Sequence, residues 1–64
     1  MTVNGKPVSL DAPMTVGQFL ESQGYNPARV AVEQNGEIVR RADFDTRTLA
    51  DTDTLEIVQF VGGG

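Results

Sequence analysis

The chain has 64 residues, no cysteine and no histidine, and a formal net charge of −4 at pH 7. A chain this short has room for one core and one domain, and a self-contained active site is not expected. The missing residue types exclude thiol nucleophiles, histidine bases and Cys/His metal sites, while the negative charge opposes nucleic-acid binding and favours a basic partner.

Targeting signals are not evident in the sequence. No apolar run approaches the roughly 20 residues that a membrane span needs. Residues 1–5 show no basic stretch followed by an apolar one. We therefore expect neither export nor membrane insertion, and a cytoplasmic protein.

The first predicted elements are two short strands joined by a turn. Val3 precedes Asn4-Gly5, a dipeptide that tolerates the positive φ angles of tight hairpins, and the second strand is expected at 8–10. Pro7 limits that second strand to a sheet edge or a strand start. Residues 11–14 then break the pattern.

A short helix is predicted to begin after Thr15. Thr15 and Gln18 have the spacing of a capping box, in which each side chain bonds to the backbone of the other residue. Gly24 suits a left-handed helix end and Pro27 opposes continuation, which gives a helix of about ten residues. The apolar positions on its buried face are Val16, Phe19 and Leu20.

The clearest hairpin signal is Asn35-Gly36, which separates 30–33 from 37–40. A helix between two strand pairs predicts an α+β domain with the helix on one face of the sheet.

Residues 41–50 show no sustained period and predict a loop with a helical turn that buries Phe44 and Leu49. A turn at 51–53 then leads into the best β segment of the chain, 54–60.

Side chains in this last strand should alternate between the two faces of the sheet. If Leu55 and Ile57 face the helix, Val58 and Phe60 lie on the uncovered face. With Val61 they form a candidate docking patch for a partner protein. The alternative is that the twist of the sheet or the preceding loop covers them.

The dispersed acidic and basic residues are given no catalytic or metal-binding role. The spacing of the aspartates does not match a calcium loop, so they are expected to be solvated turn residues. The basic pair Arg40-Arg41 is expected to pair with neighbouring acids. The aspartates considered are Asp43, Asp45, Asp51 and Asp53.

Over its whole length the chain resembles the ThiS family, the ubiquitin-like sulfur carriers of thiamine biosynthesis. The resemblance implies a β-grasp fold with a mixed sheet of about four to five strands, one main helix, and parallel first and last strands. It places the domain at 1–60 and a flexible tail at 61–64. The segments that carry the resemblance are Val3–Lys6, the helix after Thr15-Val16, Val32–Val39, Asp51–Val58 and Val61–Gly64.

The resemblance also implies a role for the terminal glycines. An E1-like adenylating enzyme would use ATP and Mg²⁺ to activate Gly64, and a sulfur donor such as a cysteine desulfurase system would convert it to a thiocarboxylate. Thiazole synthase would then take the sulfur. The family's functional glycines correspond to Gly63 and Gly64, and Gly62 extends the tail that threads the partner's active site. The chain itself would bind no cofactor.

Apart from the resemblance, the residue types themselves favour attachment of sulfur at a carboxyl group. Without cysteine the chain cannot hold a persulfide. Glycines lack Cβ atoms and can enter a narrow cleft. At roughly 3.3–3.6 Å per residue, residues 61–64 span about 13 Å. A frayed chain end is the simpler alternative for the glycines alone.

Two further functions remain open at this point. One is a ubiquitin-like modifier joined to lysines of other proteins. The other is a sulfur carrier for molybdopterin or cysteine synthesis. Gene neighbours would distinguish the carrier pathways better than any residue of the chain.

Overall fold

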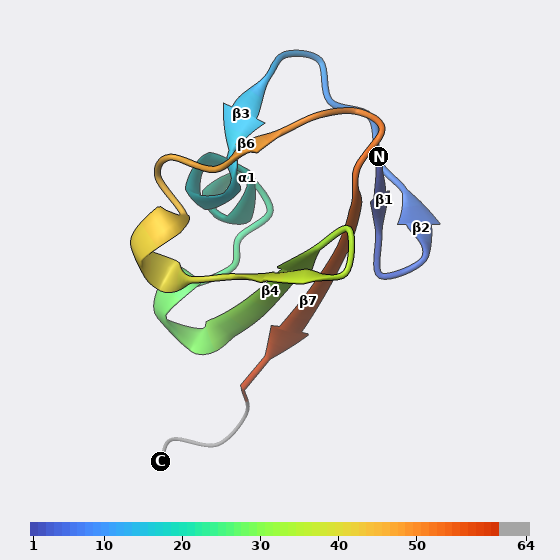
Figure 1. The fold of residues 1–64 in the computed structure, drawn as a ribbon. Helices are drawn as coiled ribbons and strands as arrows, with labels where there is room; N and C mark the ends of the chain where they lie inside the picture. Colours follow the sequence, from blue (N-terminus) through green and yellow to red (C-terminus); the bar gives the residue numbers. More distant parts are fainter. Residues whose placement is uncertain (61–64) are drawn as a thin grey trace.

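The computed structural model describes residues 1–60, and its main feature is a five-stranded sheet (Figure 1). Strands β1 and β7 are parallel, whereas the other neighbouring strands are antiparallel. The sheet is therefore mixed, and its adjacent first and last strands confirm the expected β-grasp arrangement. In spatial order the strands are β2 (Lys6–Pro7), β1 (Thr2–Val3), β7 (Thr54–Gln59), β4 (Val30–Gln34) and β5 (Glu37–Val39).

Both predicted Asn-Gly turns are present. Asn4 and Gly5 have φ angles of 51° and 82°, and Asn35 and Gly36 have 52° and 85°. Positive φ at both central residues produces the backbone twist that matches the flanking strands of a two-residue hairpin. The sequence signal for each hairpin therefore has a direct conformational cause.

The second strand of the first hairpin differs from the prediction. It is Lys6–Pro7, immediately after the turn, rather than 8–10. Pro7 lies in the edge strand β2, where a missing N–H is tolerated. Beyond it, the Leu10 amide donates to the Asp51 carboxylate at 3.1 Å instead of to another strand.

The helix α1 spans Val16–Ser22 and has the predicted capping box. The Gln18 amide donates to Thr15 Oγ1 at 3.1 Å, and the Thr15 amide donates to Gln18 Oε1 at 2.9 Å. The helix has seven residues instead of about ten, because the chain reaches a C-cap at Gln23 and a positive φ of 82° at Gly24. Within residues 1–60, no helix is long and apolar enough to cross a membrane.

The segments flanking α1 form structure that was not predicted. β3 (Met14–Thr15) pairs with β6 (Thr48–Leu49) in a separate two-stranded sheet, although 11–14 and 41–50 showed no strand pattern. The 3₁₀ helix η1 (Pro27–Arg29) was also missed. The expected helical turn after β5 is η2 (Arg41–Asp43).

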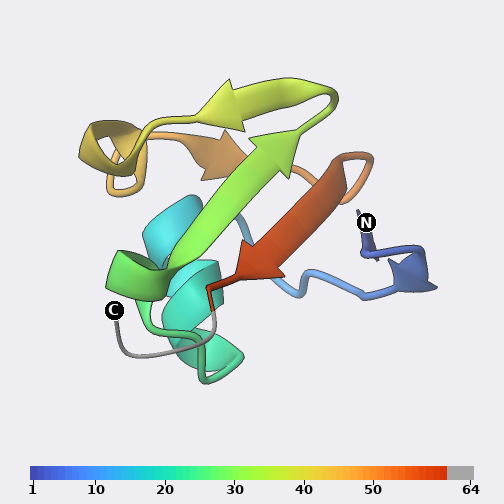
Figure 2. The same ribbon diagram turned by 90° about the horizontal axis from the view of Figure 1, so that it is seen from below.

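One core fills the space between α1 and the sheet, and Figure 2 shows α1 alongside β4 and β7. The predicted burial of Phe44 and Leu49 is confirmed. The buried apolar side chains are Val16, Phe19, Leu20, Val30, Val32, Val39, Phe44, Leu49, Leu55 and Ile57.

The two turn asparagines also bind β7 through their side chains. Asn4 accepts from the Ile57 amide at 2.8 Å and donates to the Ile57 carbonyl at 3.2 Å. Asn35 accepts from the Thr54 amide at 2.9 Å. Each hairpin turn is therefore joined to the central strand as well as to its own hairpin.

Two aspartates satisfy polar groups at the start of β7. Asp53 accepts hydrogen bonds from Gln34 Nε2 at 2.7 Å, Ala50 N at 2.8 Å and Asn35 Nδ2 at 2.9 Å. Burial raises the pKa of Asp53, but these bonds outweigh burial and the net pKa lies below its ordinary value. The pKa of Asp51 is also lowered, first by the Leu10 amide and then by the bond and charge of the N-terminal amine.

We predict that acid weakens the fold through these two groups. Because both carboxyls have a pKa below the unfolded value, their stabilisation is complete above about pH 4 and is lost as the pH falls through the lower folded values. Urea unfolding at pH 6 and at pH 3 should show the loss, and Asp53→Asn should reduce it. A free energy of unfolding that is equal at both pH values would contradict the assignment.

Candidate functional site

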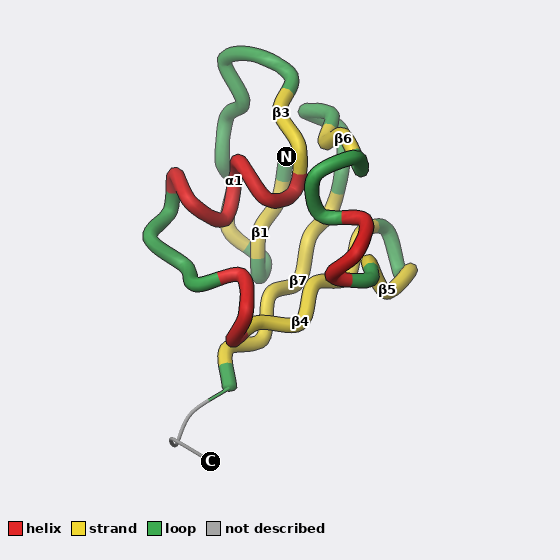
Figure 3. Tube along the Cα trace, turned by 90° about the vertical axis from the view of Figure 1, so that its left-hand side faces the viewer, coloured by secondary structure: helices red, strands yellow, loops and turns green. Residues whose placement is uncertain are grey.

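Strand β7 carries the chain to the end of the body opposite the β3–β6 sheet (Figure 3). Gln59 is paired with Val30 of β4, and the next amide, of Phe60, donates to the Arg29 carbonyl at 2.8 Å. Phe60 is thus fixed at the tail root, by which we mean the last described residue before 61–64. The predicted site residues Val61, Gly62, Gly63 and Gly64 lie outside the described residues.

The predicted alternation along β7 is present in the structure. Leu55 and Ile57 are 1% and 6% exposed and belong to the core, whereas Val58 and Phe60 are 58% and 55% exposed. Neither the twist of the sheet nor the loop before β7 covers the two exposed side chains. Val58 and Phe60 therefore lie free on the outer face, the face of the sheet that α1 does not cover.

A third apolar side chain, Ile38 of β5, was missed in the sequence. It is 67% exposed. Its neighbour Val39 is buried, so alternation within β5 places Ile38 outward. The alternation is clear once the bounds of β5 are known, but a strand of three residues is too short for the sequence alone to reveal it. We call Ile38, Val58 and Phe60 the outer patch.

A small hollow of about 100 Å³ lies within the outer face, and both apolar and acidic residues line it. It spans three strands, because Ala31 of β4 is paired with Val58 of β7 and Glu33 of β4 with Ile38 of β5. The hollow therefore continues the outer patch across the sheet. Its lining residues are Ala31, Val32, Glu33, Ile38, Glu56 and Val58.

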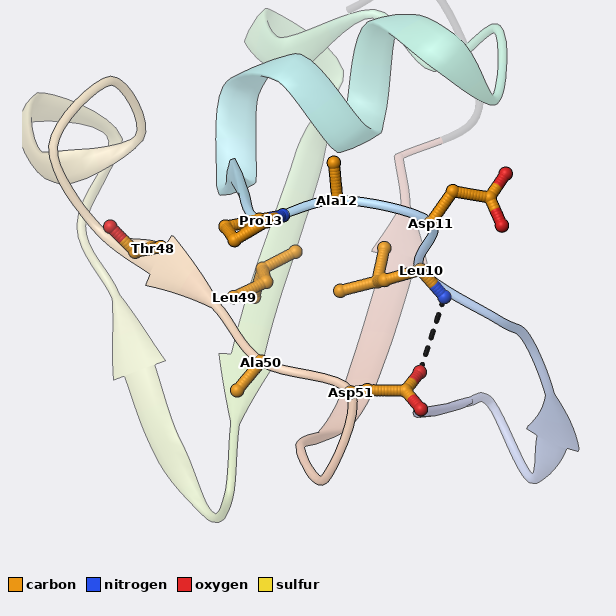
Figure 4. Close-up of a pocket in the computed structure, with 8 residues that line it drawn as sticks. All are labelled: Leu10, Asp11, Ala12, Pro13, Thr48, Leu49, Ala50 and Asp51. Carbon is orange, nitrogen blue, oxygen red and sulfur yellow. Dashed lines mark hydrogen bonds between the residues drawn. The ribbon is translucent and has the colours of Figure 1, made fainter.

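A larger hollow of about 420 Å³ lies at the other end of the body, between residues 10–13 and 48–51 (Figure 4). Its walls are mainly apolar. Asp51 there already accepts from Leu10 N, and Asp11 points away from Leu49. This hollow lies far from the tail root, so the outer face is the better candidate site.

The aspartates of the sequence were given no metal-binding role. Within 1–60, no three acidic side chains come together in a way that could hold an ion. Asp51 and Asp53 instead accept hydrogen bonds from the backbone and from amide side chains.

Comparison with known proteins agrees with this architecture. The model of the ThiS family matches residues 1–64 of the chain. The chain belongs to the ThiS family. A ThiS-family relative, the sulfur carrier protein ThiS of Bacillus subtilis, is 37% identical over 65 residues, which cover all of this chain and 98% of that protein.

Solved structures support the same assignment. The chain resembles the crystal structure of the thiamine biosynthesis protein ThiS from Geobacter metallireducens with a TM-score of 0.81. The sequence identity is 39%, and the match covers 98% of this chain and 96% of the other. The β-grasp fold is therefore shared with an experimentally determined ThiS structure.

Longer proteins also contain a ThiS-like region. The chain is 41% identical over 64 residues to a thiazole synthase of Paramagnetospirillum magneticum, a match that covers all of this chain and 20% of that enzyme. The chain spans about a fifth of the length of the thiazole synthases that it matches.

We predict that polar substitution of two neighbouring residues of β7 has unequal effects on the free energy of unfolding. Ile57→Thr leaves a void and a buried hydroxyl, and should lower the free energy of unfolding by about 2 kcal/mol or more. Val58→Thr keeps the branched Cβ on the exposed face and should change it by less than about 0.5 kcal/mol. Phe60→Asp should likewise leave the fold intact. Chemical denaturation measures all three, and a cooperative loss of folding in Phe60→Asp would mean that Phe60 is a core residue.

Proposed function

We propose that this chain is a sulfur carrier of thiamine biosynthesis that holds sulfur as a thiocarboxylate at Gly64. The observation that carries the proposal is the junction at Phe60. There β7, which pairs with β1 at its start and with β4 to its end, leads into Val61-Gly62-Gly63-Gly64 in a chain without cysteine. The family membership and the Bacillus subtilis relative named a sulfur carrier support it.

The proposed activation takes place on a partner enzyme. A carboxylate oxygen of Gly64 attacks the α-phosphorus of ATP, pyrophosphate leaves, and an acyl-adenylate forms. Mg²⁺ and cationic side chains that stabilise the phosphate charge belong to an E1-like adenylating partner. The chain described here contributes a substrate carboxyl and acts as a co-substrate rather than as an enzyme.

Sulfur then replaces AMP at the same carbon. With hydrosulfide as the nucleophile, sulfur attacks the acyl carbon, the carbon–oxygen bond to AMP breaks, and the product is the thiocarboxylate. In the cell a donor such as a cysteine desulfurase system would supply this sulfur. Glycines at 62 and 63 suit the step because a tail without Cβ atoms fits a narrow active-site channel.

Thiazole synthase is the proposed acceptor of the sulfur. Regions similar to this chain make up about a fifth of proteins named thiazole synthase, which supports a common task for the two. A carrier that delivers its tail to a second enzyme needs no catalytic pocket of its own.

The test is the intact mass of the chain. The full chain ending at Gly64 is incubated with the adenylating enzyme of thiamine biosynthesis, Mg-ATP and sodium sulfide. Its mass should increase by the difference between sulfur and oxygen. A chain lacking Gly64 should gain no such mass and should unfold at the same urea concentration as the full chain.

Two outcomes would refute the proposal. One is an unchanged mass with an enzyme that converts its own known carrier, and the other is conversion of the shortened chain. Chains linked to lysines of other proteins, seen as ladders on denaturing gels, would instead identify a ubiquitin-like modifier.

A further inference from the structure

The outer face has a charge pattern along β4, β5 and β7 in addition to its apolar patch. The large apolar side chains that are exposed within residues 1–60, Ile38, Val58 and Phe60, all lie on this face. Exposed apolar groups collected on one face of a small soluble domain indicate a contact surface. The charged residues around them decide which partner fits.

Acidic side chains border the patch on the side away from the tail root. Glu33 of β4 is paired directly with Glu56 of β7, and both line the 100 Å³ hollow beside Ile38 and Val58. Like charges placed directly opposite each other across two strands destabilise a sheet. The ion pairs formed within residues 1–60 are Met1 with Asp51 and Arg47 with Glu37, so neither Glu33 nor Glu56 is neutralised there.

Two basic residues lie on the side of the patch toward the tail root. Arg29 is opposite Phe60, because the Phe60 amide donates to its carbonyl. Arg40 follows β5 in an extended conformation, and continuing the β4–β5 register places it beside Ala31. Both arginines are exposed. Neither is in an ion pair with any residue of 1–60. The prediction that Arg40 and Arg41 pair with neighbouring acids is therefore wrong within these residues, where Arg41 donates instead to the Ala28 carbonyl at 3.0 Å.

The outer face is therefore polarised along β7. Arg29 lies beside Phe60 at the tail root, Arg40 lies level with Val58, and Glu33 and Glu56 lie farther along the strand, level with Ile38. From this pattern we infer that the face docks the adenylating partner in one orientation. The partner would place acidic groups beside the tail entrance and, farther away, a basic side chain whose aliphatic stem fills the hollow. This inference rests on the proposed function.

The chemistry of the hollow matches a lysine or arginine of the partner. Such a side chain has an apolar stem and a cationic end, and the stem commonly lies along apolar surface while the charge stays at the edge. Ala31, Ile38 and Val58 provide the apolar wall, and Glu33 and Glu56 provide two carboxylates at the rim. A cation there would also relieve the repulsion between the glutamates.

A single docking orientation would direct the tail toward the partner's active site. Residues 61–64 follow Phe60 directly, and the acyl carbon must reach one position in the partner's active site. Charges of opposite sign at the two ends of a patch disfavour the reversed arrangement, in which like charges would meet. Docking in one orientation thus directs every productive encounter toward the tail entrance.

The decisive experiment uses charge reversals of both signs. Glu56→Lys and Arg29→Glu are compared with the full chain as substrates of the adenylating enzyme, with KM and kcat taken from pyrophosphate release. The matched control is Glu21→Lys, which makes the same charge change on the exposed side of α1. Both outer-face variants should raise KM by about tenfold, while kcat stays within about twofold because the tail is unchanged.

The opposite signs separate a polarised face from simple attraction by net charge. With a net charge of −4, general attraction to a basic enzyme would make Glu56→Lys weaker but Arg29→Glu tighter. A lower KM for Arg29→Glu, or an equal rise for Glu21→Lys, would overturn the inference. Conversion of the unaltered chain with an unchanged KM in all three variants would also overturn it, while leaving the proposed function intact.

Two controls complete the test. Glu56→Lys places a cation opposite Glu33, so its midpoint of thermal unfolding should be equal to or above that of the unaltered chain, and a weaker substrate cannot then be a misfolded one. Sedimentation at increasing concentration tests a second copy of the chain as the occupant. A dimer that Glu56→Lys dissociates would assign the face to self-association and overturn the inference.

Discussion

Hydrogen bonds along both edges of β7 fix the positions of the outer patch and of the tail root. The strand pairs with β1 on one side and with β4 on the other, and its inward side chains Leu55 and Ile57 lie in the core. The side chain of Asn4 adds two bonds to Ile57 from the first hairpin, and the side chain of Asn35 adds one to Thr54 from the second. Because β7 cannot shift by one residue without reversing its buried and exposed faces, the outer patch and the tail root are set together.

The sequence predicted those elements that are determined by residues close together in the chain. Asn-Gly dipeptides specify two-residue turns through positive φ, and Thr15 with Gln18 specifies the helix start through reciprocal hydrogen bonds. Alternation along β7 predicted which side chains are exposed. The sheet β3–β6 was missed because two-residue strands leave no periodic pattern and because the paired segments lie more than thirty positions apart in the chain.

The candidate site was predicted only in part for the same reason. Val58 and Phe60 could be identified from one strand, but Ile38 belongs to another, and its place in the patch follows from the β4–β5 pairing. The apposition of Glu33 and Glu56 depends on the register between strands whose residues are more than twenty positions apart. In the sequence these charges look scattered, and the net value of −4 conceals an acidic end and a basic end of one face. The parallel pairing of the first and last strands was likewise expected from family resemblance and not from any pattern in the chain.

The placement of β7 between two neighbours also has a mechanical consequence. A force that pulls on the chain beyond Phe60 acts along the axis of β7, whereas its antiparallel hydrogen bonds to β4 run nearly perpendicular to the strand. Such a force loads the bonds of the ladder in shear, all at once, instead of opening them one after another. The bonds to β1 share that load on the other edge. The body can therefore resist a pull on the end of the chain, as the proposed function requires.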